Sequence, residues 1–181
     1  MGDTKVFGIG FQRTGTGSLN EALNLLGIKS KHNAQELFDN HDHAVLRRFD
    51  GFSDNPIPLI YQHLDRALPG SKFVFTHRDV DSWLGSVEWL FTEGRVQYGW
   101  DQKPVVDRIH EALYGTTQFD ASVFRERFLC HRQEVDEYFA DRPGDLLIID
   151  LRDEEPWPPL CDFLGLEIPA LPFPHGHRRE D

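Results

Sequence analysis

The feature that most constrains the fold is the segment at residues 5–27, KVFGIGFQRTGTGSLNEALNLLG. It opens with an apolar run, passes through a turn of glycine and hydroxyl residues, and continues with leucine and alanine at helical spacing up to Gly27. The pattern predicts a strand, a turn and a helix in succession. The first amides of that helix have no carbonyl partners, and the helix dipole adds positive charge, so an anion is the natural ligand of the turn. We therefore expect a phosphate-binding loop.

The turn combines one basic side chain with several hydroxyl groups. Its candidate phosphate ligands are Arg13, Thr14, Gly15, Thr16, Gly17 and Ser18. Glycine lets the backbone approach a ligand closely, and successive amides can form an anion-binding nest. The ATPase pattern G-x-x-x-x-G-K-[ST] fits poorly from Gly10, because Thr16 then falls at the lysine and Gly17 at the magnesium-binding hydroxyl. The sequence predicts a phosphate site without a metal.

A second block also reads as a strand followed by a helix. Residues 72–77 form an apolar run, turn residues follow at 78–81, and a helix opens near Ser82. Arg78 lies at the carboxyl end of the predicted strand, and Ser86 comes eight residues later. Open α/β sheets bind ligands at the carboxyl ends of their strands. Arg78 and Ser86 are therefore candidates for binding a second anionic group.

These two blocks together resemble the sulfotransferases that use 3′-phosphoadenosine 5′-phosphosulfate (PAPS). RTGTGS at residues 13–18 is similar to the family's 5′-phosphosulfate loop, and Arg78 with Ser86 matches its 3′-phosphate site. The chain also resembles the short P-loop sulfotransferase-like branch, with LG followed by His32 and with W-x-x-L-C-x-F-L-G at residues 157–165. The resemblance spans nearly the whole chain.

The resemblance implies an α/β fold, namely a single P-loop-type three-layer domain over residues 1–181 with a central, mostly parallel sheet flanked by helices. It implies transfer of a sulfuryl group from PAPS to a hydroxyl or amine of a small-molecule acceptor, which yields adenosine 3′,5′-bisphosphate. Such a transfer needs stabilised charge on the leaving oxygen, and Arg13 is the candidate for that role. No metal is expected.

The acceptor also needs a general base, and the sequence offers three candidates. His32 follows a predicted strand and titrates in a suitable range. Asp54 precedes Asn55 and Pro56, so it could equally cap that turn. His63 lies on a predicted helix. The sequence does not decide among them.

Further along the chain, apolar patterns alternate between strands and helices, which indicates an α/β fold with a parallel sheet. The predicted elements are a short strand at 28–32, helices at 58–68, 105–114 and 120–139, and a buried strand at 146–149. Residues 33–52 read as a polar region with helical pieces, residues 91–102 as a loop or lid, and residues 171–181 as a loosely held tail.

Two other functions remain open. LLIID at residues 146–150 looks like the Walker B strand of a P-loop NTPase or small-molecule kinase, although the loop lacks the lysine of those enzymes. Gly17 stands where many sulfotransferases carry a second threonine, so a non-catalytic nucleotide-binding module is the third reading. Trp83 is either an adenine platform or a core residue.

Charge and composition limit the classes of partner that the chain is expected to bind. With 30 acidic against 19 basic residues, the net charge of −11 argues against nucleic acid and favours a small acceptor. The pairs His41/His43 and His175/His177 are weak evidence for a metal without a third ligand. No apolar run approaches the roughly 20 residues of a membrane span, and the start of the chain lacks a signal-peptide pattern. We expect a cytoplasmic protein that does not bind membranes, whose oligomeric state the sequence does not give.

Overall fold

The computed structural model of the chain describes residues 4–152 and 155–175. The fold has two compact units, one formed by Met1–His77 with Arg142–Asp181 and the other by Arg78–Asp141. The expectation of one domain over residues 1–181 stays a prediction.

The first unit is built on a parallel sheet of five strands in the order β2-β3-β1-β4-β5. Its strands are β1 (Val6–Gly8), β2 (Ser30–His32), β3 (Gly51–Ser53), β4 (Lys72–Thr76) and β5 (Leu146–Ile149). Every pairing between neighbours is parallel, and β1 lies at the centre with all three of its residues buried. The α/β fold with a parallel sheet is confirmed.

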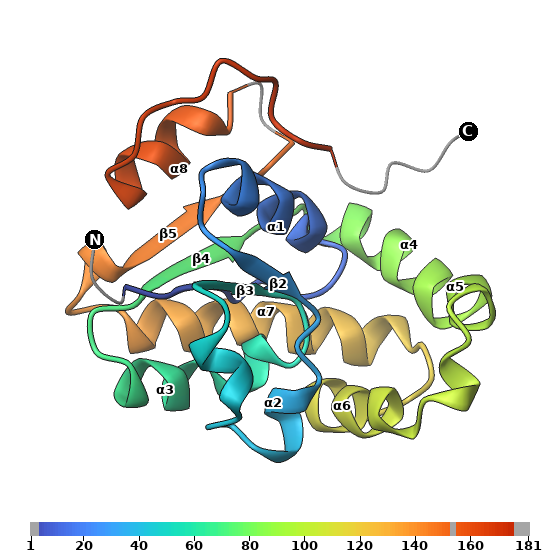
Figure 1. The fold of residues 1–181 in the computed structure, drawn as a ribbon. Helices are drawn as coiled ribbons and strands as arrows, with labels where there is room; N and C mark the ends of the chain where they lie inside the picture. The colour runs from blue at the N-terminus through green and yellow to red at the C-terminus, as the bar shows by residue number, and fades with distance from the viewer. Residues whose placement is uncertain (1–3, 153–154, 176–181) are drawn as a thin grey trace. The chain divides into compact units, whose positions relative to one another are not determined.

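Helices cover both faces of this sheet, which gives the expected three layers (Figure 1). Helices α1 and α8 lie on one face and α3 lies on the other. The helical segments of this unit are α1 (Thr16–Leu25), α2 (Glu36–Asp39), α3 (Ile57–Ala67) and α8 (Trp157–Leu164), with short 3₁₀ turns η1 (Ala44–Arg47) and η3 (Pro143–Asp145). Crossover helices on the faces are what a parallel sheet requires to connect its strands.

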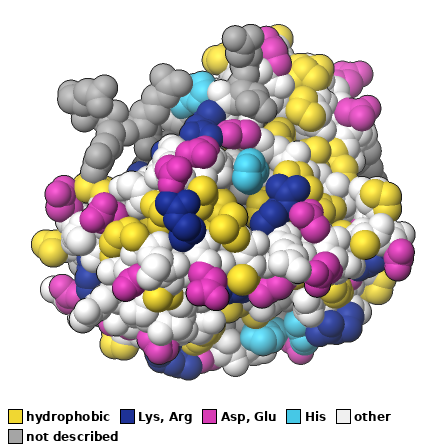
Figure 2. Space-filling view, turned by 180° about the vertical axis from the view of Figure 1, so that it is seen from behind, with side chains coloured by type: hydrophobic (Ala, Val, Ile, Leu, Met, Phe, Trp, Pro, Cys, Tyr) yellow, Lys and Arg dark blue, Asp and Glu magenta, His cyan; other side chains and the backbone are white. Residues whose placement is uncertain are grey.

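The surface reflects the acidic composition. Figure 2 shows acidic side chains distributed over the face seen from behind, with basic and hydrophobic side chains interspersed among them. With a net charge of −11, the chain must hold any anionic ligand by local donors against an unfavourable overall field. None of the helices formed by the described residues is both long enough and apolar enough to cross a membrane.

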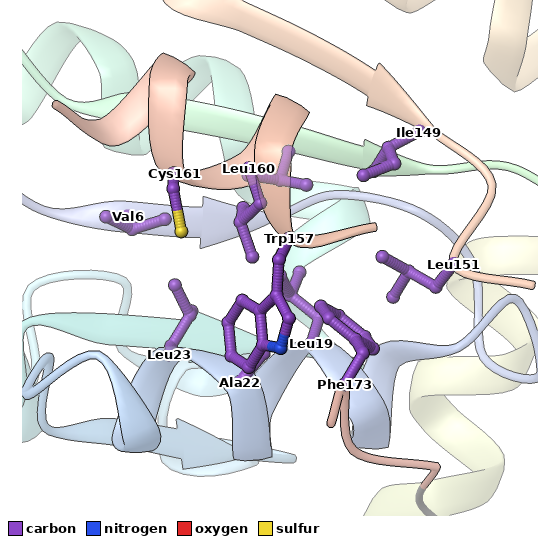
Figure 3. Close-up of a cluster of buried hydrophobic side chains, with 11 residues drawn as sticks. Val6, Leu19, Ala22, Leu23, Ile149, Leu151, Trp157, Leu160, Cys161 and Phe173 are labelled. Carbon is purple, nitrogen blue, oxygen red and sulfur yellow. The ribbon is translucent and has the colours of Figure 1, made fainter. Parts of the chain in front are cut away.

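Part of the core of the first unit is formed by α1, α8 and the chain that follows α8 (Figure 3). Trp157 of α8 packs edge-on against Phe173, with ring centroids 4.7 Å apart, and its indole Nε1 donates a hydrogen bond to the Leu171 carbonyl at 2.8 Å. Phe173 is only 7% exposed. The segment expected to be loose, residues 171–181, therefore contributes a buried side chain within its described part.

The second unit is helical. It contains α4 (Val80–Phe91), α5 (Glu93–Gln97), the 3₁₀ turn η2 (Trp100–Gln102), α6 (Pro104–Tyr114) and α7 (Ala121–Tyr138). Trp83 is 0% exposed and lies 4.4 Å from Phe128 and 6.1 Å from Phe124 between ring centroids. The core reading of Trp83 is correct, because a fully buried indole has no free face for an adenine ring.

Two local expectations differ from the structure. Residues 91–102 form α5 and η2 rather than an irregular loop. The polar region at 33–52 runs into β3, which the sequence did not predict. A strand of only three residues, Gly-Phe-Ser, is too short to show the alternation that identifies strands. The last strand, Leu146–Ile149, has the predicted bounds.

Candidate functional site

The loop between β1 and α1 has the curled backbone of an anion-binding nest. Arg13 and Gly15 take left-handed φ angles of 69° and 105°, and Gly15 lies immediately before the first residue of α1. Residues alternate in exposure along the loop: Gln12, Thr14, Thr16 and Ser18 are buried, whereas Arg13, Gly15 and Gly17 are partly accessible. Successive amides in such a conformation, continued by a helix N-terminus, form a concave donor surface for an anion.

Thr14 fixes this loop to the end of β4. Its hydroxyl donates to the Phe11 carbonyl at 2.6 Å and shares a hydrogen bond of 2.6 Å with the hydroxyl of Thr76. Gly10 lies so close to the same group that an added Cβ would stand 2.1 Å from Thr76 Oγ1. The loop therefore requires glycine at position 10, because no side chain fits there.

Thr16 links the loop to β3. Its hydroxyl donates to Asp54 Oδ2 at 2.9 Å, and its carbonyl accepts from the Ser53 hydroxyl at 3.0 Å. The hydroxyls of Thr14 and Thr16, which the sequence suggested as phosphate donors, thus both have protein partners. The third hydroxyl residue of the predicted set, Ser18, is buried in the first turn of α1.

His32 and Asp54, far apart in sequence, form a pair beside Thr16. The strands β2 and β3 are parallel neighbours in a register that pairs His32 with Ser53, so the residue after Ser53 lies at the same sheet edge. His32 Nε2 lies 2.9 Å from Asp54 Oδ2 and 3.4 Å from the Thr16 hydroxyl. The side chain of His32 is 34% exposed and that of Asp54 only 13%. The structure brings together two of the three candidate bases.

The second predicted anion site lies in the other unit, at the start of α4. Arg78 donates through Nε at 3.1 Å and Nη2 at 2.9 Å to the Ser82 hydroxyl. Ser86 follows Ser82 by one helical turn, so both serines share a face of α4. Of the two nearby carboxylates, Asp79 caps α4 by accepting from the Ser82 amide at 2.8 Å, and Asp81 forms an ion pair with Arg125.

Comparison of the sequence with known proteins identifies a family that matches most of the chain. The sequence matches the family described as sulfotransferase domain over residues 5–45 and 35–181. The chain belongs to the sulfotransferase domain family. A curated relative, the Ava biosynthesis cluster protein M of Aspergillus versicolor, is 27% identical over an alignment that covers 94% of this chain and 80% of the relative.

Within this sulfotransferase-family chain, His32 and Asp54 shift each other's pKa in the directions that favour an ion pair. Burial lowers the pKa of His32, but the charge and hydrogen bond of Asp54 outweigh that effect, so the pKa lies above its ordinary value of 6.5. Burial acts to raise the pKa of Asp54, yet His32, the Asn55 amide and the Thr16 hydroxyl bring it below the ordinary 3.8. Asp54 thus stays ionised, and His32 is the member of the pair with the higher pKa.

The hydrogen bonds also fix which ring nitrogen of His32 is available. A carboxylate only accepts, so Nε2, which faces Asp54, carries a proton. In the neutral ring the lone pair then resides on Nδ1. A base with an ionised carboxylate behind it and a lone pair on its other nitrogen can take a proton from a hydroxyl or ammonium group.

Sequence reasoning missed two residues that support this site. The Asn55 side-chain amide donates to Gln12 Oε1 at 3.0 Å, and both residues are buried. The Asn55 backbone amide donates to Asp54 Oδ1 at 2.6 Å, so Asn55 holds the carboxylate and the loop together. The only signal in the sequence was that Gln12 and Asn55 both carry side-chain amides. Each follows one of two parallel strands that end at the same edge of the sheet.

The other sequence candidates lie elsewhere. His63, on α3, has Nε2 3.1 Å from Asp42 Oδ1, and its ring centroid is 5.0 Å from that of His41. Across residues 4–152 and 155–175, no three metal-binding side chains converge. His175 is exposed, whereas His177 lies outside the described residues.

Proposed function

We propose that this member of the sulfotransferase domain family transfers a sulfuryl group from PAPS to a hydroxyl or amine of a small molecule. One observation carries the proposal: Thr16, the first residue of the helix after the phosphate loop, hydrogen-bonds Asp54, which pairs with His32. A candidate base is thereby joined to a candidate phosphate cradle. The relative from a biosynthesis cluster is compatible with a small-molecule acceptor.

The donor nucleotide would be held by the residues that the family resemblance indicates. Arg13, with the amides of the loop and Ser18, would bind the 5′-phosphosulfate, and Arg78 with Ser86 would bind the 3′-phosphate. Thr14 and Thr16 would act mainly by shaping the loop, since their hydroxyls are bonded to Thr76 and Asp54. A charge-assisted contact from a guanidinium is worth more than one from a neutral donor, so the two arginines are the key cations.

The transfer step would use the His32–Asp54 pair as the base. The acceptor oxygen or nitrogen attacks the sulfur, and its proton moves to His32 Nδ1. The bond between sulfur and the bridging oxygen breaks, and adenosine 3′,5′-bisphosphate leaves with that electron pair. Asp54 acts through His32, because it stabilises the imidazolium ion that forms. Arg13 stabilises the charge that develops on the leaving phosphate.

A kinase or NTPase is the weaker alternative. The aspartate of the sequence that resembles a Walker B strand, Asp150, accepts from Arg152 Nε at 2.9 Å and from Arg152 Nη2 at 2.6 Å. Binding of magnesium would have to displace that ion pair. The loop also offers threonine where those enzymes have lysine. A non-catalytic nucleotide-binding module differs from our proposal only in lacking turnover.

Turnover with a library of small hydroxyl and amine acceptors and sulfur-labelled PAPS tests the proposal. We expect labelled product from at least one acceptor, together with an equal amount of adenosine 3′,5′-bisphosphate. The matched control is the His32→Gln variant, which should bind the nucleotide but transfer little label. Nucleotide binding without any transfer would support the non-catalytic module, and no binding would reject the proposal.

A further inference from the structure

The second unit contains a cavity that is open to solvent and lined only by residues of this unit, with Glu88, Thr92 and Gln118 exposed. Its volume is about 560 Å³, within the range of roughly 300–1,000 Å³ that holds small organic ligands. The end of α4, α5 and the connection between α6 and α7 form its wall. The lining residues used below are Glu88, Phe91, Thr92, Arg95, Gln118 and Phe119.

The basic residue of the cavity is already neutralised. Arg95 donates through Nε to Asp101 at 2.6 Å, and through Nη1 and Nη2 to Asp107 at 2.8 Å and 3.0 Å. Two carboxylates thus face one guanidinium. Glu88, by contrast, has no ion pair with any residue in the described part of the chain. Glu88 and Arg95 in the lining, together with the two carboxylates that pair with Arg95 behind it, carry a net negative charge.

The two helix ends at the cavity have opposite polarity, and only the end of α4 favours a cation. The last turn of α4, which includes Glu88 and Phe91, has no basic residue to complement the negative end of its dipole. Thr92 caps that end by donating its amide and hydroxyl to the Glu88 carbonyl at 3.1 Å and 2.8 Å. The positive end of α7 begins after Phe119, where Asp120 caps it by accepting from the Ser122 amide at 2.9 Å.

Aromatic rings provide the apolar part of the lining. Phe91 is buried, and Phe119 is half-buried with its ring centroid 5.3 Å from that of Phe124. The face of an aromatic ring attracts an organic cation, and its area buries an apolar body. Gln118 and Thr92 add hydrogen-bonding groups to the same wall.

We propose that this cavity binds a small organic cation, a protonated amine with an aromatic or aliphatic body, and that Glu88 is its counter-ion. The half-buried ring of Phe119 would contact the body of the ligand, while the carboxylate of Glu88 and the negative end of α4 would bind the ammonium group. The inference does not depend on sulfuryl transfer, because none of the residues that line the cavity is among those proposed to bind the nucleotide or to act as the base.

The test is an NMR titration of the isotopically labelled full chain with 2-phenylethylamine and its neutral analogue 2-phenylethanol. We expect the amine to shift the amide signals of Thr92, Gln118 and Phe119 saturably, and the alcohol to bind several-fold more weakly. Glu88→Gln should weaken amine binding about fivefold, the scale of a single partly exposed charge pair.

Glu93→Gln is the matched control, because it removes the same charge from an exposed position in α5 that does not line the cavity. It should leave amine affinity within twofold of the unmodified protein. Equal binding of amine and alcohol, equal losses in the two variants, or signal changes confined to the loop around Arg13 would each overturn the proposal. Thermal unfolding of both variants establishes that they are folded.

Discussion

At the scale of single residues, His32 and Asp54 have different roles although both were candidate bases. Asp54 accepts hydrogen bonds from Thr16 and the Asn55 amide as well as from His32, so it is held as a carboxylate. His32 is more exposed and has the higher pKa of the pair. The pair resembles the general arrangement in which a buried carboxylate orients a catalytic imidazole and stabilises its protonated form.

We predict that His32→Gln lowers kcat for sulfuryl transfer by about 10²- to 10⁴-fold, the usual contribution of a general base. Affinity for adenosine 3′,5′-bisphosphate should stay within twofold, because His32 contacts the loop only at 3.4 Å from the Thr16 hydroxyl. Initial rates and calorimetry measure the two quantities. His63→Gln is the control with unchanged kcat. A loss of less than threefold in His32→Gln would remove it as the base.

The pH profile tests the role of Asp54. A base must be neutral, and the pKa of His32 is raised above 6.5, so kcat/KM should rise with pH to a midpoint above that value. Asp54→Asn removes the charge that raises this pKa and leaves burial, which lowers it. The midpoint should therefore move to lower pH while the maximal rate falls. A profile that keeps its midpoint in Asp54→Asn contradicts the pairing.

The sequence predicted the succession of strand, turn and helix at residues 5–27 better than it predicted this pair. Glycines in a turn and apolar residues at helical spacing leave a local signature in the sequence. In the structure, Arg13 and Gly15 take left-handed φ angles. His32 and Asp54 are 22 residues apart, and only the pairing of β2 with β3 brings them together. Because β3 was not predicted, the two residues were left as alternatives rather than recognised as partners.

At the scale of elements, the fold depends on close approach between the β1–α1 loop and β4. An alanine at Gly10 would place Cβ 2.1 Å from Thr76 Oγ1 and 2.4 Å from the Thr76 carbonyl oxygen. We predict that Gly10→Ala lowers the free energy of unfolding by about 1–3 kcal/mol, the usual cost of overpacking, and also weakens nucleotide binding. Urea denaturation followed by circular dichroism measures the stability.

Gly85→Ala is the control for that experiment. Gly85 lies inside α4, nothing stands within 4 Å of an added Cβ, and its φ is not in the left-handed region. Alanine there should stabilise the helix by about 0.5–1 kcal/mol, because glycine loses more backbone entropy on folding. If Gly10→Ala were as stable as Gly85→Ala, the contact between the loop and Thr76 would not constrain the fold.

The packing of α8 gives a second prediction at this scale. Phe173 is buried against Trp157 (Figure 3). The side chain of Leu171 in the same segment is exposed. Phe173→Ala should cost about 3–5 kcal/mol of unfolding free energy, and Leu171→Ala less than about 0.5 kcal/mol. Equal and small losses in denaturant titrations of both variants would show that this segment is not part of the core.

Helices were easier to predict than short strands and connections. The helix Pro104–Tyr114 begins at a proline and ends before a glycine, and both signals are local. The helix Ala121–Tyr138 begins after Asp120, whose carboxylate accepts from the amides of Ser122 and Val123. Residues 91–102 contain glycine and aromatic residues that suggested a loop, but tertiary packing of Phe91 and Trp100 stabilises short helices there.

At the scale of the whole molecule, the acidic charge requires that an anionic nucleotide be held by a few local cations. A net charge of −11 gives no general attraction for phosphate groups. Each arginine of the two proposed anion sites should therefore matter individually. Arg13→Ala should depress turnover more than nucleotide affinity, because its contacts strengthen as charge develops on the leaving phosphate. Steady-state kinetics with parallel calorimetry separates these effects, and equal losses in both would contradict that role.

The most direct test of the account is calorimetric titration of the protein with adenosine 3′,5′-bisphosphate and, separately, with ATP plus magnesium. We predict metal-independent binding of the bisphosphate in preference to ATP, and a loss of about 1.5–3 kcal/mol in Arg78→Ala, the scale of a charged hydrogen bond. Preferential binding of ATP with magnesium, or bisphosphate affinity that is unchanged in both Arg13→Ala and Arg78→Ala, would contradict the account.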